Sequence, residues 1–346
     1  MCFRNTQEEK DCMWEIKGGS KAHRILWDAE QNQLSWAYMK MLREHFDKKK
    51  IYDINPFVEV YQFRDNLYGL FTPNCDGMGD PWMWLIIGPE KAMLIDTAFG
   101  LGDLKGLVDE ITGGMPLIVA NTHQGPDHAF GNCHFDKVYC HEQMAWLISQ
   151  QNNNQWDYLF DENGNGKWIT ITREDLPTFK PYELIPVPNN TVFNLGGDYD
   201  VELIYLPGHG TGHCDFMDKK NRILFVGDIV VADSAGIGSG PRPGMPYGEC
   251  CTLEALRNEL VKVCARMDEF DYIYCSHFMV DVENHVLNNI VDAINEVLEN
   301  PNNYTYRVVR YGKDGKPHYS YYKHVIGWST FNYVMNGVYI NKRIEE

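Results

Sequence analysis

The chain has 346 residues and carries 31 Lys and Arg against 48 Asp and Glu, which gives a formal net charge of −17 at pH 7. This acidity repels phosphate backbones and argues against a general nucleic-acid surface. Hydrophobic residues make up 44% and charged residues 23%, the ordinary balance of a globular protein, and no run of about 18 apolar residues suggests a membrane span. Residues 1–10 lack the apolar stretch of a signal peptide, which favours a cytoplasmic location.

The first half of the chain alternates between helical and strand-like patterns. Apolar residues recur at helical spacing from Leu34, and this helix is expected to end near the three lysines at 48–50. A second helix at 101–111 is closed by Gly113 and Gly114, and an apolar strand at 116–120 leads into Asn121. Between the two helices, short β-like runs predict a meander at residues 58–63, 67–72, 83–87 and 92–95.

The second half predicts alternating strands and helices, followed by a hairpin. Thr252 begins a helix, and another helix over 286–298 is stopped by Pro301. Two β-like runs around the turn at 313–316 indicate the hairpin. The whole pattern predicts a mixed α/β fold with an accessory helix in front and a hairpin behind. The predicted strands of this half are residues 201–206, 223–226, 272–275, 304–311 and 319–325.

Ten cysteines are spread irregularly along the chain and form no Cys-x-x-Cys pair. Reduced thiols are therefore the expected state. The adjacent Cys250 and Cys251 could instead form a metal or redox feature, although no second pair accompanies them.

Metal-ligating side chains gather at the ends of the predicted strands. His123, Asp127 and His128 lie within six residues of one another, directly after the strand at 116–120. Single candidates follow three later strands: His209, Asp228 and His277. Strand ends are where open sheets collect ligands, and imidazole and carboxylate groups are the donors preferred by zinc, iron and manganese. The pattern predicts a metal site.

These residues also stand in a familiar order. Residues 123–128 read His-Gln-Gly-Pro-Asp-His, and the chain resembles the metallo-β-lactamase superfamily of metallohydrolases, whose signature there is His-x-His-x-Asp-His. Further matches are the strand-end Asp96, the Pro-Gly-His run ending at His209, the Gly-Asp pair ending at Asp228 and the Ser-His pair ending at His277. The match covers roughly residues 57–280.

The resemblance implies an αββα sandwich with a metal site at one edge. It divides the chain into an N-terminal arm and accessory helix at 1–56, a metallo-β-lactamase-like domain at 57–300 and an aromatic-rich hairpin extension at 301–346. Zinc is the implied cofactor, as one or two ions, with iron or manganese as alternatives.

The resemblance also implies a role for each site residue. One ion would bind His123 and His209, and a second would bind Asp127, His128 and His277. Asp228 would bridge the two ions, and Asp96 would hold the histidine turn by hydrogen bonds.

One position departs from the family signature, because Gly125 stands where the second histidine belongs. Either the first ion persists on its remaining ligands, or only the second set fills and the protein is mononuclear. The second set is complete and is expected to bind more tightly. His134, His213 or Cys214 could replace the missing ligand, but a structural role is the expectation for each.

Two regions outside the signature are candidates for contacts. In the Gly- and Pro-rich stretch after Asp228, Arg242 or Tyr247 could orient a substrate carboxylate or oxyanion, although an exposed loop cation is usually solvated. The tyrosine-rich tail packs on the sandwich or contributes to a homo-oligomer interface.

The favoured function is a metal-dependent hydrolase in which a metal-activated water attacks a small-molecule ester, lactone, thioester, amide or phosphodiester. Asp127 would orient that water, and Asp228 would bridge or accept a proton. The expected partners are the small-molecule substrate and, as an open alternative, a second copy of the chain, with neither nucleic acid nor membrane. The alternatives are a non-haem iron protein of the same superfamily with redox or oxygen chemistry, and a non-catalytic binding protein on a degenerate site.

Overall fold

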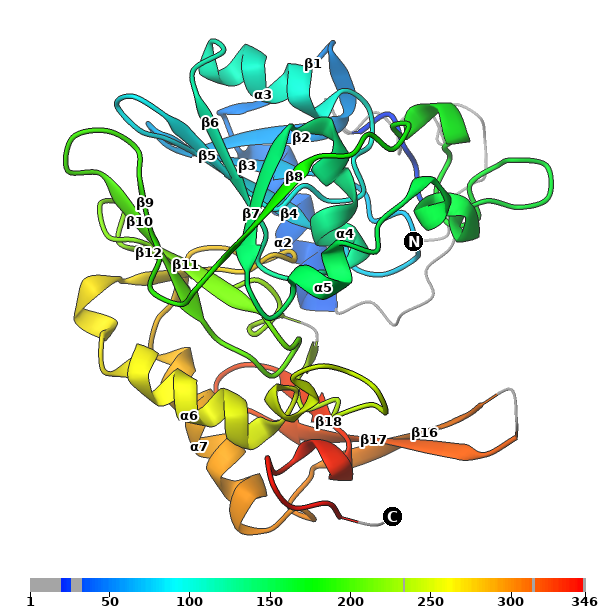
Figure 1. Cartoon of the computed structure of the whole chain (residues 1–346), viewed down its shortest axis with the longest axis vertical. Coiled ribbons are helices and arrows are strands. Elements are labelled where there is room, and N and C mark those ends of the chain that lie inside the picture. The colour runs from blue at the N-terminus through cyan, green and yellow to red at the C-terminus, as the bar shows by residue number, and fades with distance from the viewer. Residues whose placement is uncertain (1–19, 26–32, 233, 313–314, 345–346) are drawn as a thin grey trace. The chain divides into compact units, whose positions relative to one another are not determined.

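The computed structural model describes residues 20–25, 33–232, 234–312 and 315–344 (Figure 1). The predicted N-terminal arm up to residue 19 and the two turn residues Lys313 and Asp314 of the predicted hairpin lie outside this part of the chain. The described residues divide into two compact units. Unit 1 takes its residues from 1–119, 125–136 and 151–182, and unit 2 takes its residues from 120–124, 137–150 and 183–346.

Unit 1 contains the predicted meander. The four predicted strands are preceded by one that was not predicted, β1, and all five pair in chain order, each antiparallel to the next. Gly69 pairs with Trp84, and a Cβ at position 69 would lie 2.9 Å from the ring of Trp82, so only glycine leaves room for the buried indole. The strands are β1 (Lys49–Tyr52), β2 (Asn55–Arg64), β3 (Leu67–Phe71), β4 (Trp82–Ile87) and β5 (Ala92–Ile95).

The first helix is confirmed, and it ends shortly before the lysine run, as predicted. Helix α2 (Gln33–His45) stops at His45, and Lys49 begins strand β1, where it pairs with Tyr61. The Nζ of Lys49 donates to the carbonyl of Arg43 at 2.8 Å. Pairing with the long strand β2 therefore determines the conformation of the lysine run, which local helical spacing cannot show.

The second helix of unit 1 ends as the glycines predict. Helix α3 (Leu104–Thr112) is capped by the side chain of Asp103, and Gly113 closes it in the left-handed region at φ 68°. Strand β6 (Leu117–Ala120) follows. The remaining helices of the unit are short: α4 (Pro126–Ala129), η1 (Phe130–His134), η2 (Asn153–Leu159) and η3 (Arg173–Asp175).

Unit 2 is built on a six-stranded sheet with the order β15-β14-β12-β11-β10-β9. Strands β12 and β14 pair in parallel, and the other neighbours are antiparallel. Outside this six-stranded sheet, the same unit contains β7 (Lys137–His141) and β8 (Glu183–Val187), which pair in parallel. The six strands are β9 (Val192–Asn194), β10 (Asp200–Tyr205), β11 (Cys214–Asp218), β12 (Ile223–Phe225), β14 (Tyr272–Tyr274) and β15 (Val282–Glu283).

Two amphipathic helices pack with this sheet into one hydrophobic core. Thr252 caps the first helix by accepting a hydrogen bond from the amide of Ala255, as a threonine ahead of an apolar stripe predicts. Leu256 and Ile294 from the helices join Met217 from the sheet in this core, and each such fully buried side chain contributes about 1.5–3 kcal/mol. The helices of the unit are α5 (Ala145–Ile148), α6 (Leu253–Cys264), α7 (Val286–Glu299), η4 (Gly248–Cys250), η5 (Met267–Glu269) and η6 (Met335–Gly337).

The C-terminal hairpin is confirmed, and it belongs to a larger sheet of unit 2. Strands β16 (Tyr306–Tyr311) and β17 (Pro317–His324) form the hairpin, which extends outward in Figure 1. Strand β18 (Thr330–Tyr333) pairs with β17, and β13 (Ser234–Gly236) pairs in parallel with β18. The sequence patterns did not predict β13 or β18.

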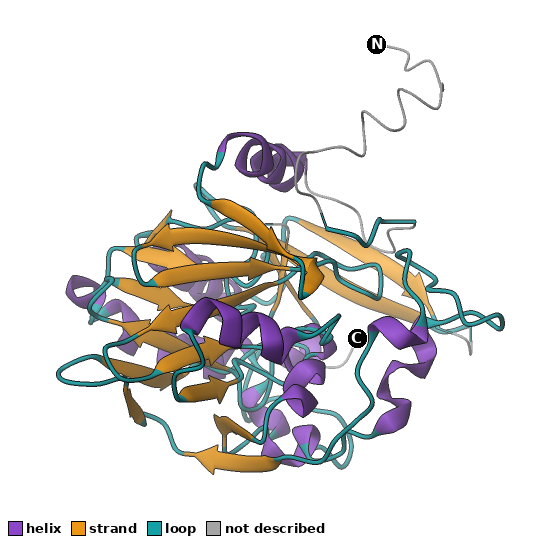
Figure 2. Ribbon diagram, turned by 90° about the horizontal axis from the view of Figure 1, so that it is seen from above, coloured by secondary structure: helices purple, strands orange, loops and turns teal. Residues whose placement is uncertain are grey.

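The secondary structure confirms the expected mixed α/β class (Figure 2). Among the described residues, no helix is both long enough and apolar enough to cross a membrane.

Candidate metal centre

Three predicted ligands converge within unit 2. His123, His209 and Asp228 each offer one ligand atom, and these atoms all lie within 4.8 Å of one another. The Oδ2 of Asp228 lies 3.7 Å from Nε2 of His209 and 4.0 Å from Nε2 of His123. The two imidazole rings are nearly perpendicular, with centroids 4.6 Å apart. Both Nε2 atoms therefore face the same carboxylate.

His123 is fixed at the end of β6 by its neighbours in unit 2. Its Nδ1 lies 3.1 Å from the hydroxyl of Thr122, and the Thr122 carbonyl accepts a hydrogen bond from the amide of Cys214 at 2.9 Å. The Cys214 thiol itself donates to the carbonyls of Asn121 and Thr122. Cys214 therefore supports the turn that carries His123, and only 2% of the His123 side chain is exposed.

His209 stands on the turn that follows β10. Gly208 precedes it with φ 115°, and a Cβ there would lie 2.8 Å from Leu256, so the turn needs a glycine. The Nδ1 of His209 lies 2.9 Å from the carbonyl of Gly236 and donates to it, which leaves Nε2 for an ion. A quarter of the His209 side chain is exposed.

Asp228 follows β12 and is held through its backbone by His213. The Nδ1 of His213 donates to the carbonyl of Leu206 at 3.0 Å, and its Nε2 accepts from the amide of Asp228 at 3.2 Å. A Cβ on Gly227 would lie 2.4 Å from that Nε2, so glycine is required before the aspartate. Both ring nitrogens of His213 are thus engaged, and it orients Asp228 instead of replacing the missing ligand.

His277 completes the cluster in unit 2. Its Nε2 lies 3.3 Å from Oδ1 of Asp228, on the other carboxylate oxygen from the one that faces His123 and His209. The amide of Ser276 donates to the carbonyl of Gly227 at 3.1 Å, which joins the ends of β14 and β12. Burial raises the pKa of the neighbouring Cys275 thiol, so this cysteine stays protonated.

Unit 1 brings together a second set of predicted residues. The Nδ1 of His128 lies 2.9 Å from Oδ2 of Asp96, and both side chains are at most 1% exposed. The Nε2 of His128 lies 3.6 Å from Oδ1 of Asp127, and Asn74 donates to Oδ2 of Asp127 at 3.0 Å. Asp96 thus occupies the place of a carboxylate that orients a ligating imidazole. The predicted ion set of Asp127, His128 and His277 draws on both units and stays a prediction.

The backbone around Asp96 is unusual. Asp96 and Ala98 have φ values of 65° and 50°, which non-glycine residues seldom adopt. Between them, the amide and hydroxyl of Thr97 donate to the carbonyl of His128 at 2.8 and 3.2 Å. A Cβ on Gly131 would lie 2.2 Å from the Thr97 carbonyl, so the two loops approach through glycine. Such strain is typical of functional sites.

The other sequence candidates lie outside these sets. The Nε2 of His134 lies 2.9 Å from the carbonyl of Gly100, and burial lowers the pKa of His134, so this histidine is a neutral structural residue. Gly125 caps α4 through its backbone alone. Arg242 and Tyr247 are exposed on the loop after β13 and do not belong to the His123 group, so their proposed substrate contacts stay predictions.

Sequence reasoning missed two groups that hold site residues. Asn74 holds Asp127, and the carbonyl of Gly236 holds His209. The Asn-Cys-Asp-Gly run at 74–77 is a turn signal that could have drawn attention to Asn74. A backbone carbonyl leaves no trace in residue type, so Gly236 had no such signal.

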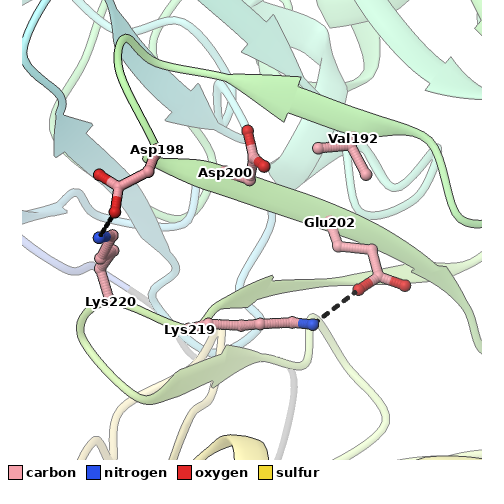
Figure 3. Close-up of a pocket in the computed structure, with 6 residues that line it drawn as sticks. All are labelled: Val192, Asp198, Asp200, Glu202, Lys219 and Lys220. Atoms are coloured by element: carbon pink, nitrogen blue, oxygen red, sulfur yellow. Dashed lines mark hydrogen bonds and ion pairs between the residues drawn. The ribbon is translucent and has the colours of Figure 1, made fainter.

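A shallow pocket of about 240 Å³ lies elsewhere in unit 2 (Figure 3). Asp200 and Glu202 line it at the start of β10, whereas His209 follows the opposite end of the same strand. Its charges largely neutralise one another, because Lys220 pairs with Asp198 at 2.5 Å and Lys219 lies 3.8 Å from Glu202. This pocket is therefore distinct from the histidine cluster.

The donors in unit 2 fit a divalent ion. Two atoms that bind one zinc ion at about 2.1 Å stand about 3.4 Å apart at a tetrahedral angle. The distances of 3.7 and 4.0 Å from Asp228 to the two imidazoles need only small inward shifts to reach this value. Imidazole nitrogen and carboxylate oxygen suit zinc, manganese and iron alike.

Comparison with known proteins places the chain in a family. The model of the metallo-beta-lactamase superfamily matches residues 76–261, and the chain belongs to that superfamily. The mixed α/β fold is accordingly of the metallo-β-lactamase type, as the sequence motifs predicted.

Several individual proteins are similar to the chain. Proteins named acyl-coenzyme A thioesterase MBLAC2 from Gallus gallus and Homo sapiens are each 28% identical to it, over 164 and 168 residues. Each alignment covers 43% of this chain and 57% of the relative, so the match spans little more than half of those proteins. Among solved structures, DIM-1 metallo-beta-lactamase exposed to ceftazidime is 18% identical with a TM-score of 0.48, covering 69% of this chain and 97% of that chain.

Proposed function

We propose that this protein is a metal-dependent hydrolase whose His123, His209 and Asp228 hold a divalent ion, with zinc as the first candidate. The observation that carries the proposal is the convergence of three donor atoms within 4.8 Å in unit 2. The Nδ1 atoms of His123 and His209 already have hydrogen-bond partners, so each ring presents its Nε2 to the Asp228 carboxylate. Ligating histidines in metalloenzymes are typically held in this way.

A divalent ion bound there lowers the pKa of a water molecule and polarises the scissile group, so a hydrolase needs no serine or cysteine nucleophile. The family resemblance implies that the Asp127 carboxylate would orient the water, and within unit 1 its Oδ2 is fixed by Asn74. Asp228, whose backbone is fixed by His213, would hold the ion and would also be the group that takes up a proton. The two carboxylates thus take separate tasks.

The family signature also motivates a second ion on Asp127, His128 and His277, with Asp228 shared between the ions. Its support is the order of the motifs and the pairing of His128 with Asp96. Because Gly125 stands where the family signature has a histidine, the first set has one ligand fewer. We propose that a substrate oxygen takes the coordination position left open. Arg242 and Tyr247 are proposed to orient the substrate from the loop after β13.

A thioester is the first substrate class to test, because the similar proteins from chicken and human are named acyl-coenzyme A thioesterases. The other candidates, esters, lactones, amides and small phosphodiesters, serve as comparison substrates. A thioester carbonyl is electrophilic and its thiolate is a good leaving group, so the general chemistry of the site suits it.

The test uses the full chain stripped with a chelator and then reloaded with zinc, assayed against an acyl-coenzyme A, an oxoester, a lactone and a phosphodiester. His209→Ala and Asp228→Asn should each lower turnover by at least about 100-fold, since each removes a proposed ligand. His318→Ala is the matched control, because His318 is exposed on the hairpin and should leave turnover unchanged. Full activity in the stripped protein, or in His209→Ala, would overturn the proposal.

A further inference from the structure

His209 depends on a strand that comes later in the chain. The Nδ1 of His209 donates to the carbonyl of Gly236, and Gly236 is the last residue of β13. Two residues further on, the amide of Gly238 donates to the carbonyl of Gly208 at 3.0 Å. The segment 236–238 therefore forms two hydrogen bonds with the His209 turn, one with the imidazole ring and one with the backbone carbonyl of the preceding residue.

That segment is in turn held by β18. Gly236 pairs with Asn332, the Asn332 carbonyl accepts from the amide of Ile237 at 3.1 Å, and the amide of Val334 donates to the carbonyl of Gly238 at 3.1 Å. The side chain of Asn332 adds two contacts, since its Nδ2 donates to the Ser234 hydroxyl at 3.2 Å and to the Ala235 carbonyl at 3.4 Å. One asparagine thus contacts β13 through both its backbone and its amide.

The packing around this contact is tight. A Cβ on Gly337 would lie 1.8 Å from the Gly238 carbonyl, so the two backbones touch directly. Phe331 and Tyr333 flank Asn332 and are each 1% exposed in the same core as Leu206, which directly precedes the His209 turn. The family model ends at residue 261, so β18 lies beyond the matched region.

We propose that Asn332 is a positioning residue for the metal centre, because it holds β13 and thereby fixes the Gly236 carbonyl that orients the His209 imidazole. The inference rests on the proposed function, since it assumes that His209 binds the ion. It assigns part of the metal centre to the C-terminal extension. The C-terminal strand β18 then contributes to metal affinity.

The test compares Asn332→Ala, Asn332→Asp and the control Asn336→Ala, whose exposed asparagine lies on the same segment. The dissociation constant of the more weakly held zinc ion, the one proposed on His123, His209 and Asp228, is measured by competition with a chelating dye. Removing the hydrogen-bond partner of a ligating histidine costs about 10–100-fold in affinity, and Asn332 acts one step further away, so Asn332→Ala should weaken zinc binding about threefold to tenfold. Asn332→Asp should weaken it at least as much, because a carboxylate oxygen repels the Ala235 carbonyl at the same volume.

A spectroscopic readout separates positioning from general stability. In protein with ¹⁵N-labelled histidine, the Nδ1–H resonance of His209 should shift or broaden in both Asn332 variants and stay in place in Asn336→Ala. If Asn332→Asp matches the wild type in zinc affinity and in this resonance, the amide has no positioning role and the inference is wrong. The inference is equally wrong if Asn332→Ala changes only the melting temperature.

A parallel His209→Ala variant keeps the two proposals apart. If His209→Ala binds the more weakly held zinc ion as the wild type does, the ligand assignment itself fails. If His209→Ala loses zinc affinity and the Asn332 variants do not, the proposed metal site stands and the positioning role of Asn332 is rejected.

Discussion

The two units hold their candidate ligands by different means. In unit 1, the ring of His128 is backed by the carboxylate of Asp96 at 2.9 Å, with both side chains buried. In unit 2, the ring of His209 is backed at the same distance by the neutral carbonyl of Gly236, and a quarter of its side chain is exposed. Behind the ring of His123 stands the neutral hydroxyl of Thr122.

This contrast concerns charge more than geometry. A carbonyl or hydroxyl fixes the ring orientation and the tautomer, whereas a buried carboxylate also raises the basicity of the imidazole and so strengthens its bond to a cation. The ion that binds His128 should therefore be held more tightly than the ion that binds His123 and His209. The absence of a third histidine at Gly125 acts in the same direction.

The largest expected effect is the loss of the tightly held ion. Elemental analysis of protein purified without chelator should find nearer one retained ion per chain than two. Asp127→Ala, His128→Ala and His277→Ala should each remove that ion, because each deletes one of the three ligands that belong to this set alone. His123→Ala, the comparison variant from the other set, should keep it. Two tightly retained ions, or wild-type metal content in all three ligand variants, would contradict the contrast.

A smaller effect follows from the groups behind the rings. Asp96→Asn should weaken binding of the retained ion about 10–100-fold, since it removes the charge but keeps the shape. Thr122→Val removes a neutral partner of His123. It should change the affinity for the other ion, the one on His123 and His209, less than threefold, about 0.6 kcal/mol. The measurement is zinc release to a chelator followed over time. If Asp96→Asn speeds release of its ion no more than Thr122→Val speeds release of the other ion, the carboxylate charge has no role.

Gly125→His tests whether the missing ligand serves substrate access. The backbone at Gly125 has φ −51° and ψ 145°, which any residue can adopt, so the substitution causes no backbone strain. The new imidazole should tighten the second ion by about tenfold or more and lower turnover of the best substrate, because the ring fills the proposed substrate position. Metal stoichiometry and turnover are measured on the same preparation. Higher turnover with two bound ions would reject the access hypothesis.

The smallest expected effect is on the pH dependence of folding stability in unit 2, at a residue that is not a candidate ligand. In unit 2, hydrogen bonds from Arg266, and then from Lys219, lower the pKa of Glu269 from 4.5 to about 2, despite some burial. Its contribution to stability is therefore present above the unfolded pKa near 4.5 and is lost as the pH falls through about 2. Partial exposure screens the network, so the contribution is about 1–2 kcal/mol.

Glu269→Gln should accordingly lower the urea unfolding free energy at pH 6, and its difference from the wild type should shrink by pH 2.5. The metal content of this variant at pH 7 should equal that of the wild type. A difference in unfolding free energy that does not change with pH would show that the ion pairs contribute nothing.

Local patterns predicted the four longest helices, many of the strands and the candidate ligands, because their causes are local. The Thr252 cap begins α6, Gly113 ends α3 in the left-handed region, and the motif residues follow strands that alternation and apolar runs reveal. The family resemblance then supplied the sandwich, which those patterns alone leave open.

The parts that escaped prediction depend on distant partners. The lysine run became the start of β1 because it pairs with β2, and β13 is a strand only because Thr330–Tyr333 lies beside it. The partners of the site residues follow the same rule, since Asn74 and Asp127 are 53 positions apart. Neither residue type nor local spacing records such contacts.

The pairing of β13 with β18 also sets an order of events during synthesis. Ser234 pairs with Thr330, so every ligand candidate, including His277, is made before the strand that steadies His209. Contacts of such long sequence separation form late in folding. A nascent chain thus passes through a stage in which all the candidate ligands have been made, whereas the strand that pairs with β13 has not.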